Sequence, residues 1–128
     1  MGHNSGRRES ELRERMQRDA RDRERVADAI AVVEQWNARL TAGKPAHWSP
    51  TIGAAILARQ PWLRLYCPGC RQQHELDLRR LVRPCEFPIT ALSLRCESGC
   101  RGQSPRPELL GLVAAPYDRK RLTWEVSA

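Results

Sequence analysis

Two cysteine pairs, separated by twenty-five residues, constrain this 128-residue chain more than any other feature. The first pair is Cys67-Pro68-Gly69-Cys70, and the second, Cys96-Glu97-Ser98-Gly99-Cys100, has one more residue in its turn. Zinc prefers four soft anionic ligands at tetrahedral corners about 2.3 Å away, and two such turns supply four thiolates. Pro68 fixes its own φ, and Gly69 lets the chain curl so that backbone N–H groups can face the sulfurs. The spacing predicts one structural zinc ion bound by Cys67, Cys70, Cys96 and Cys100.

Other uses of the cysteines stay open at this point. A fifth cysteine, Cys85, lies in the connection between the pairs and is expected to be a small buried or half-exposed residue. Either Cys85 or His74 could take the place of Cys100 if the longer turn closes poorly. The chain could also fold without metal. A redox-active Cys-x-x-Cys is less favoured, because no long helix follows Cys67 to lower its pKa.

A long helix is predicted from Ser10 to about Leu40, a stretch without proline or glycine and rich in helix formers. Opposite charges recur at i and i+4 in its first half, which we expect to be solvated on nearly every face. The second half carries an apolar stripe, made of Val26, Ile30, Val33, Trp36 or Asn37, and Leu40. This stripe predicts packing on the rest of the protein or on a second copy of the helix.

A short helix and a set of strands are predicted beyond Gly43. Ser49-Pro50 suits an N-cap and first turn for a helix over 51–60, with Ile52, Ala55 and Ile56 facing inward. The hydrophobic period then changes to two, which is typical of strands. Strands are expected on both sides of the first cysteine pair and later in the chain, over 62–67, 75–79, 92–96, 109–114 and 121–126.

These elements predict an α+β fold, with a long N-terminal helix, a short helix and a small β-rich zinc-ribbon-like domain. We divide the chain into a charged helical arm over 1–43, a linker with the short helix over 44–61, and the ribbon over 62–128. The arm and the remainder differ so much in composition that they are not expected to share one core.

The net charge of +7 lies almost entirely outside the helical arm, because residues 1–43 contribute only +1 of it. Four zinc-bound thiolates would reduce the excess of residues 44–128 from +6 to +4. Twenty arginines against two lysines suit bidentate phosphate contacts, although codon composition explains this ratio equally well. If the ribbon binds nucleic acid, with Trp62 or Tyr66 as a stacking face, the candidate contacts are Arg71, Arg79, Arg80, Arg95 and Arg101.

No catalytic pattern is visible. Four thiolates close the coordination sphere of zinc, the three histidines are dispersed, and no phosphate-binding or dinucleotide motif is present. We therefore expect no enzyme and no small-molecule substrate. No apolar run reaches the roughly 18 residues of a membrane span, and charge follows the N-terminus, so a cytoplasmic protein that does not bind membranes is expected.

The expected function is that of a small structural-zinc-binding module with an adaptor or regulatory role, using the N-terminal helix to contact a protein partner. The alternative is a nucleic-acid-binding zinc-ribbon protein that uses the basic surface. Salt-dependent binding would distinguish the alternative, because phosphate contacts release counterions.

Several short motifs resemble a family of short bacterial proteins, frequent in rhizobia-like genomes, that carry a paired-cysteine zinc site and have no established activity. In order, the matching motifs are Trp48-Ser49-Pro50-Thr51-Ile52, Pro61-Trp62-Leu63, Tyr66-Cys67-Pro68-Gly69-Cys70, Asp77-Leu78-Arg79, Leu94-Arg95-Cys96 and Leu110-Gly111-Leu112. The resemblance covers residues 47 to about 116 and implies the fold and the metal but no reaction. Family members have two residues between the second pair of cysteines, so Cys100 is the ligand that the resemblance supports least.

Overall fold

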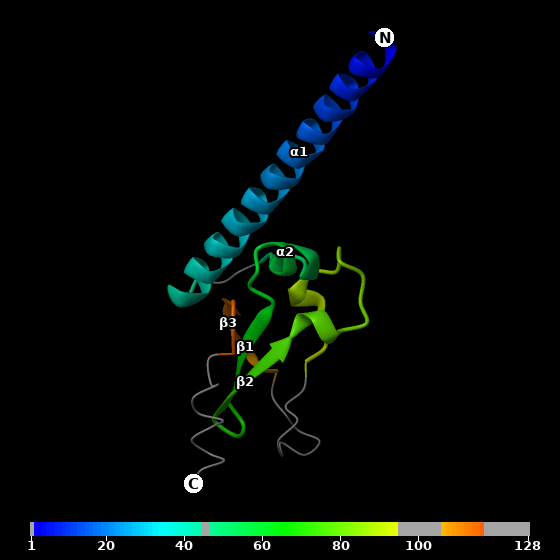
Figure 1. The fold of residues 1–128 in the computed structure, drawn as a ribbon. Helices are drawn as coiled ribbons and strands as arrows, with labels where there is room; N and C mark the ends of the chain where they lie inside the picture. Colours follow the sequence, from blue (N-terminus) through cyan, green and yellow to red (C-terminus); the bar gives the residue numbers. More distant parts are fainter. Residues whose placement is uncertain (1, 45–46, 95–105, 117–128) are drawn as a thin grey trace, which may run out of the picture.

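The computed structural model describes residues 2–44, 47–94 and 106–116, and it has the expected α+β fold (Figure 1). In chain order the elements are the helices α1 (Gly2–Thr41) and α2 (Ile52–Leu57), the strands β1 (Trp62–Cys67) and β2 (Gln72–Asp77), two 3-10 turns at Leu78–Arg80 and Ile89–Ala91, and the strand β3 (Glu108–Val113). The long helix, the short helix and the strands around the first cysteine pair are therefore confirmed.

The three strands form an antiparallel sheet in the order β2-β1-β3, with β1 in the middle. Leu63 pairs with Leu76 of β2 and with Leu112 of β3, so one face of the sheet is apolar along this row. The alternation read from the sequence is observed directly, because Leu63, Leu65 and Cys67 are buried and the residues between them are half-buried. A bulge between Arg64 and Leu65 shifts the β3 register, and Gly111 takes φ +141° beside it.

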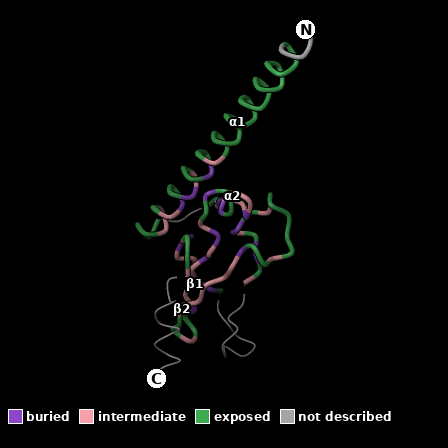
Figure 2. Tube along the Cα trace, in the orientation of Figure 1, coloured by how far each residue is buried: buried purple, intermediate pink, exposed green. Residues whose placement is uncertain are grey.

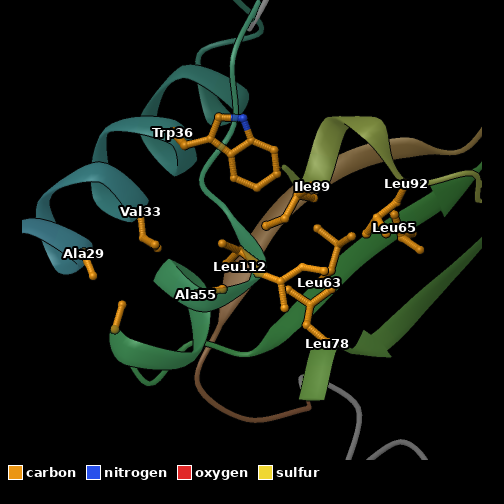
Figure 3. Close-up of a cluster of buried hydrophobic side chains, with 12 residues drawn as sticks. Ala29, Val33, Trp36, Ala55, Leu63, Leu65, Leu78, Ile89, Leu92 and Leu112 are labelled. Atoms are coloured by element: carbon orange, nitrogen blue, oxygen red, sulfur yellow. The ribbon is translucent and has the colours of Figure 1, made fainter. Parts of the chain in front are cut away.

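One apolar cluster joins the helices to the sheet (Figure 3). Its buried members come from α1, α2, β1, β3 and both 3-10 turns: Ala29, Val33, Trp36, Ile52, Ala55, Ala58, Leu63, Leu65, Leu78, Ile89, Leu92 and Leu112. Three of these residues belong to α1, so the second half of the helix shares its core with the sheet. This differs from the expectation that residues 1–43 have no part in that core.

The long helix has two halves of different character (Figure 2). From Gly6 to Arg25 every residue is exposed, as the charge pattern predicted. The buried stripe of the second half is centred on Ala29, Val33 and Trp36, whereas Ile30 is 36% exposed. The prediction that Ile30 packs inward was wrong. The sheet and α2 cover the side of the helix that carries its neighbour Ala29. Val26 and Leu40, at the edge of that side, are half-buried.

The short helix and the later strands also differ in detail from expectation. Thr51 rather than Ser49 caps α2, since its hydroxyl accepts a hydrogen bond from the Ala54 N–H at 3.1 Å. Ser49 Oγ instead accepts from the Thr90 N–H at 2.9 Å. Ile56 is exposed, so its predicted inward position was wrong.

Two predicted strands differ in the described part of the chain: the one predicted over 75–79 is β2, which begins three residues earlier, at Gln72, and the one predicted over 92–96 is absent where it is described. The second strand ends at Asp77, where the 3-10 turn begins, and residues 92–94 are not in a strand. The rest of that segment, 95–96, and the predicted strand over 121–126 lie outside the described residues.

The side-chain amide of Asn37 fixes α1 against the outer edge of β3. Its Oδ1 accepts from the Leu112 N–H at 2.8 Å, and its Nδ2 donates to the Leu112 carbonyl at 3.0 Å. Both backbone groups of Leu112 point away from β1, so the amide satisfies them as another strand would. A Cβ on Gly111 would lie 2.9 Å from Asn37 Oδ1, which leaves room only for glycine there.

We predict that Asn37→Leu lowers the free energy of unfolding by roughly 2–3 kcal/mol, because two backbone groups of β3 lose their partners to an apolar side chain of similar branching. Urea unfolding measures this loss. Asn37→Gln is not expected to rescue it, since the longer side chain displaces the amide from Leu112. The exposed neighbour Ala38 provides the control, and Ala38→Gln should unfold like the unsubstituted protein.

Candidate metal centre

The first cysteine pair lies in the turn between β1 and β2. Cys67 is the last residue of β1 and is fully buried, whereas Cys70 is half-buried in the turn. The turn closes through a hydrogen bond from the Arg71 N–H to the Cys67 carbonyl at 2.8 Å, and Arg71 takes a left-handed φ of 58°. The sequence reading therefore placed this pair correctly, at the tip of a hairpin in a tight turn.

His74 faces the same tip of the hairpin. It pairs with Leu65 in the β1–β2 register, which places it on the face that carries Leu65 and Cys67. Its Nε2 lies 3.9 Å from Cys70 Sγ. A thiolate and an imidazole nitrogen bound to one tetrahedral zinc ion would lie about 3.6 Å apart, so this spacing suits a shared ion. The strand period is the sequence signal that brings His74 here.

The second cysteine pair, Cys96 and Cys100, lies outside the described residues. Within residues 2–44, 47–94 and 106–116, no group of three or more His, Cys, Asp or Glu side chains is arranged to hold a metal ion. Cys67, Cys70 and His74 therefore do not by themselves make a complete site. The zinc site over all four cysteines stays a prediction, as does the zinc-ribbon assignment that rests on it.

The fifth cysteine has a different environment. Cys85 is exposed, and its carbonyl accepts from the Gly53 N–H at 2.9 Å at the start of α2. A Cβ on Gly53 would lie 2.9 Å from Cys85 Cβ, so the two segments are in close contact. In Figure 1, α2 lies at the opposite end of β1 from the hairpin turn. Cys85 is thus an unsuitable replacement for Cys100.

The described candidates for nucleic-acid contacts do not gather in one patch. Arg71 lies in the hairpin turn, whereas Arg79 and Arg80 follow the other end of β2. The six residues of β2 separate the two ends by about 20 Å. Arg95 and Arg101 lie outside the described residues. The sheet face with Trp62, Arg64 and Tyr66 also carries the β2 residues Gln73, Glu75 and Asp77. Acidic side chains on the same face oppose phosphate binding, and nucleic-acid binding stays a prediction.

Arg79 is already engaged by Asp77. Its guanidinium binds both oxygens of the Asp77 carboxylate, at 2.9 and 3.0 Å, and the same carboxylate caps the 3-10 turn by accepting from the Arg79 N–H at 3.0 Å. Arg79 Cζ also lies 5.9 Å from the centroid of the Trp62 ring. The hydrogen bond from the Arg79 side chain is the main cause that lowers the pKa of Asp77 and raises the pKa of Arg79. This cluster closes the open end of the hairpin.

Comparisons with known proteins found no match to this chain among family models, curated proteins or solved structures. In the described part of the chain, no helix is both long and apolar enough to cross a membrane. The resemblance to the rhizobia-like family stays a prediction.

We predict that Asp77→Asn weakens the fold at neutral pH and that the difference from the unsubstituted protein disappears in acid. The folded pKa of Asp77 lies below its ordinary value of 3.8, so its ionic contribution is fully present above pH 3.8. That contribution is lost as the pH falls through the lowered folded value. Urea unfolding of both proteins between pH 7 and pH 2.5 would show two curves that converge below about pH 4.

The matched control is Glu11→Gln, which removes one exposed carboxylate from the solvated half of α1. It should follow the unsubstituted protein at every pH. A constant gap for Asp77→Asn down to the lowest pH would contradict the assigned role of the Asp77 charge, because an amide retains the cap but not the ion pair.

Proposed function

We propose that this protein is a small structural-zinc-binding module whose metal is held at the tip of the β1–β2 hairpin by Cys67 and Cys70, with Cys96 and Cys100 completing the site. The observation that carries the proposal is the position of the first pair. Cys67 and Cys70 flank one tight turn, the His74 Nε2 lies 3.9 Å from the Cys70 sulfur, and thiolate and imidazole are donor types that zinc prefers.

The distribution of the core supports a metal at this end of the sheet. The continuous apolar cluster ends on β1 at Leu65, and the next inward residue, Cys67, is fully buried but not a member of the cluster. Along β2 the same face changes from Leu76 to His74 and Gln72, which are polar. Among the described residues, apolar side chains on this face thus give way to a buried cysteine and polar side chains near the hairpin turn, and a metal ion can stabilise such an end of a small sheet.

The proposed role of the metal is structural rather than catalytic. Four thiolates fill a tetrahedral coordination sphere and leave no position for a water molecule. Function would then come from surfaces held by the folded module, in an adaptor or regulatory role within the cytoplasm. The exposed half of α1 is the surface that we assign to a protein partner.

We predict that Cys70→Ser reduces zinc from one ion per chain to less than about 0.2 and lowers the melting temperature by roughly 10 °C. Cys70 is the informative position because it is only half-buried, so the loss of packing is small. Native mass spectrometry of protein purified without a metal-binding tag measures the zinc, and calorimetry measures the melting temperature. Cys85→Ser, at an exposed cysteine near α2, should change neither.

Two further variants separate the ligand sets. Cys100→Ser should remove zinc if the four cysteines bind it, whereas His74→Gln should remove zinc only if His74 takes the place of Cys100. Equal zinc content in Cys70→Ser and Cys85→Ser would contradict the site. So would reduced protein that folds fully and takes up no zinc.

A further inference from the structure

The exposed half of α1 carries a continuous heptad row that the monomer does not use. Steps of four and three residues alternate through the row, which consists of Leu12, Met16, Asp19, Arg23, Val26 and Ile30. Leu12 and Met16 are 55% and 60% exposed, although both are large apolar side chains. Ile30 is exposed and Val26 is half-buried, so the row stays accessible along its whole length.

Up to Ile30 this row lies beside the residues that pack on the sheet. The row is accessible only that far, because its next heptad positions, Val33 and Asn37, are covered by the sheet. At 100° per residue, it is rotated by about a quarter turn from the buried residues Ala29, Val33 and Trp36. The core therefore covers one side of the helix and leaves the row on the adjacent side. From Gly6 to Arg25 the helix extends beyond the core, where every residue is exposed (Figure 2).

We propose that two copies of this protein associate through this row, with the two α1 helices antiparallel and a two-fold axis near Arg21. An antiparallel pair places a positions opposite d positions of the other helix. With this axis, Leu12 meets Ile30 of the second copy, Met16 meets Val26, and Asp19 meets Arg23. Each layer occurs twice because the interface is self-complementary.

The charges in the row decide the direction of the helices. In an antiparallel pair, each Asp19 lies opposite an Arg23, so both charges are compensated. A parallel pair in register would instead place Asp19 opposite Asp19 and Arg23 opposite Arg23 inside the seam. Two like-charge layers next to one another oppose that arrangement.

The flanks of the row fit the same arrangement. Ala20 and Ala27 border it on one side, and such small side chains let the two helices approach closely. Ala20 lies near the two-fold axis, where it would face itself. On the other side Asp22 would also face itself, at the solvent-exposed border of the seam. This like-charge contact lies where screening by water and salt is strongest.

A second copy fits this row better than an unrelated apolar helix does. An apolar partner would cover the four apolar residues but would also take Asp19 and Arg23 out of water with only each other, at i and i+4, as charge partners. A helix that neutralises both charges must place a basic residue opposite Asp19 and an acidic residue opposite Arg23, with apolar residues on either side. The row of a second copy, running in the opposite direction, meets this requirement.

Sedimentation equilibrium on the full chain tests the proposal, over concentrations up to about 1 mM. We expect reversible association of the unsubstituted protein to a dimer. Met16→Glu should raise the dissociation constant at least about tenfold, since it places a charge between apolar residues. Gln17→Glu adds the same charge one residue away, off the row, and should leave the constant within about twofold. Both positions are exposed, and circular dichroism would verify that both variants stay folded.

Charge exchange tests the direction of the helices. Asp19→Arg alone should weaken the dimer, because it places a second guanidinium opposite Arg23 in both central layers. The double variant Asp19→Arg with Arg23→Asp should restore it, since each layer regains opposite charges. In a parallel pair the single change would only exchange one like-charge layer for another, so it would weaken the dimer much less than in the antiparallel pair. A monomer at every concentration, equal constants for Met16→Glu and Gln17→Glu, or a double variant as weak as the single one would overturn the proposal.

Discussion

The packing of the C-terminal half of α1 against the sheet is the interaction on which the rest of this structure depends. Three short strands have too little surface of their own to form a stable core. Trp36, the largest fully buried side chain, supplies much of the missing volume, and Asn37 beside it satisfies the outer edge of β3. Burial and edge protection thus come from two adjacent residues of one helix.

Local patterns predicted the elements well and their mutual packing less well. The alternation through Leu63, Leu65 and Cys67 identified both the strand and its buried face, because a half-buried strand has a strict period of two. In a helix, the sequence pattern determines less strictly which residues are buried. Ile30 and Ala29 are neighbours, and only the position of the sheet determines which of them is buried. Hydrophobicity favoured Ile30, but the close approach of α2 and the sheet favours the small side chain.

At the candidate site, too, contacts between residues close in the sequence were predictable, whereas contacts between distant residues were not. The turn at Cys67 and Cys70 follows from four consecutive residues, so the sequence was sufficient to place it. The approach of His74 to Cys70 depends on strand register, which a turn with a left-handed Arg71 fixes. The Asn37 contact with Leu112 joins residues 75 positions apart, and no pattern in either segment indicates it.

The length of α1 has a mechanical consequence. Forty helical residues extend about 60 Å, and the core holds only the C-terminal part. The part of the helix before Val33 is therefore a lever about 46 Å long with its pivot at Val33 and Trp36. A tilt of about 5° at that pivot would move the free end by about 4 Å. Small rearrangements of the core would thus become large displacements at the end of the helix, where they are easiest to detect.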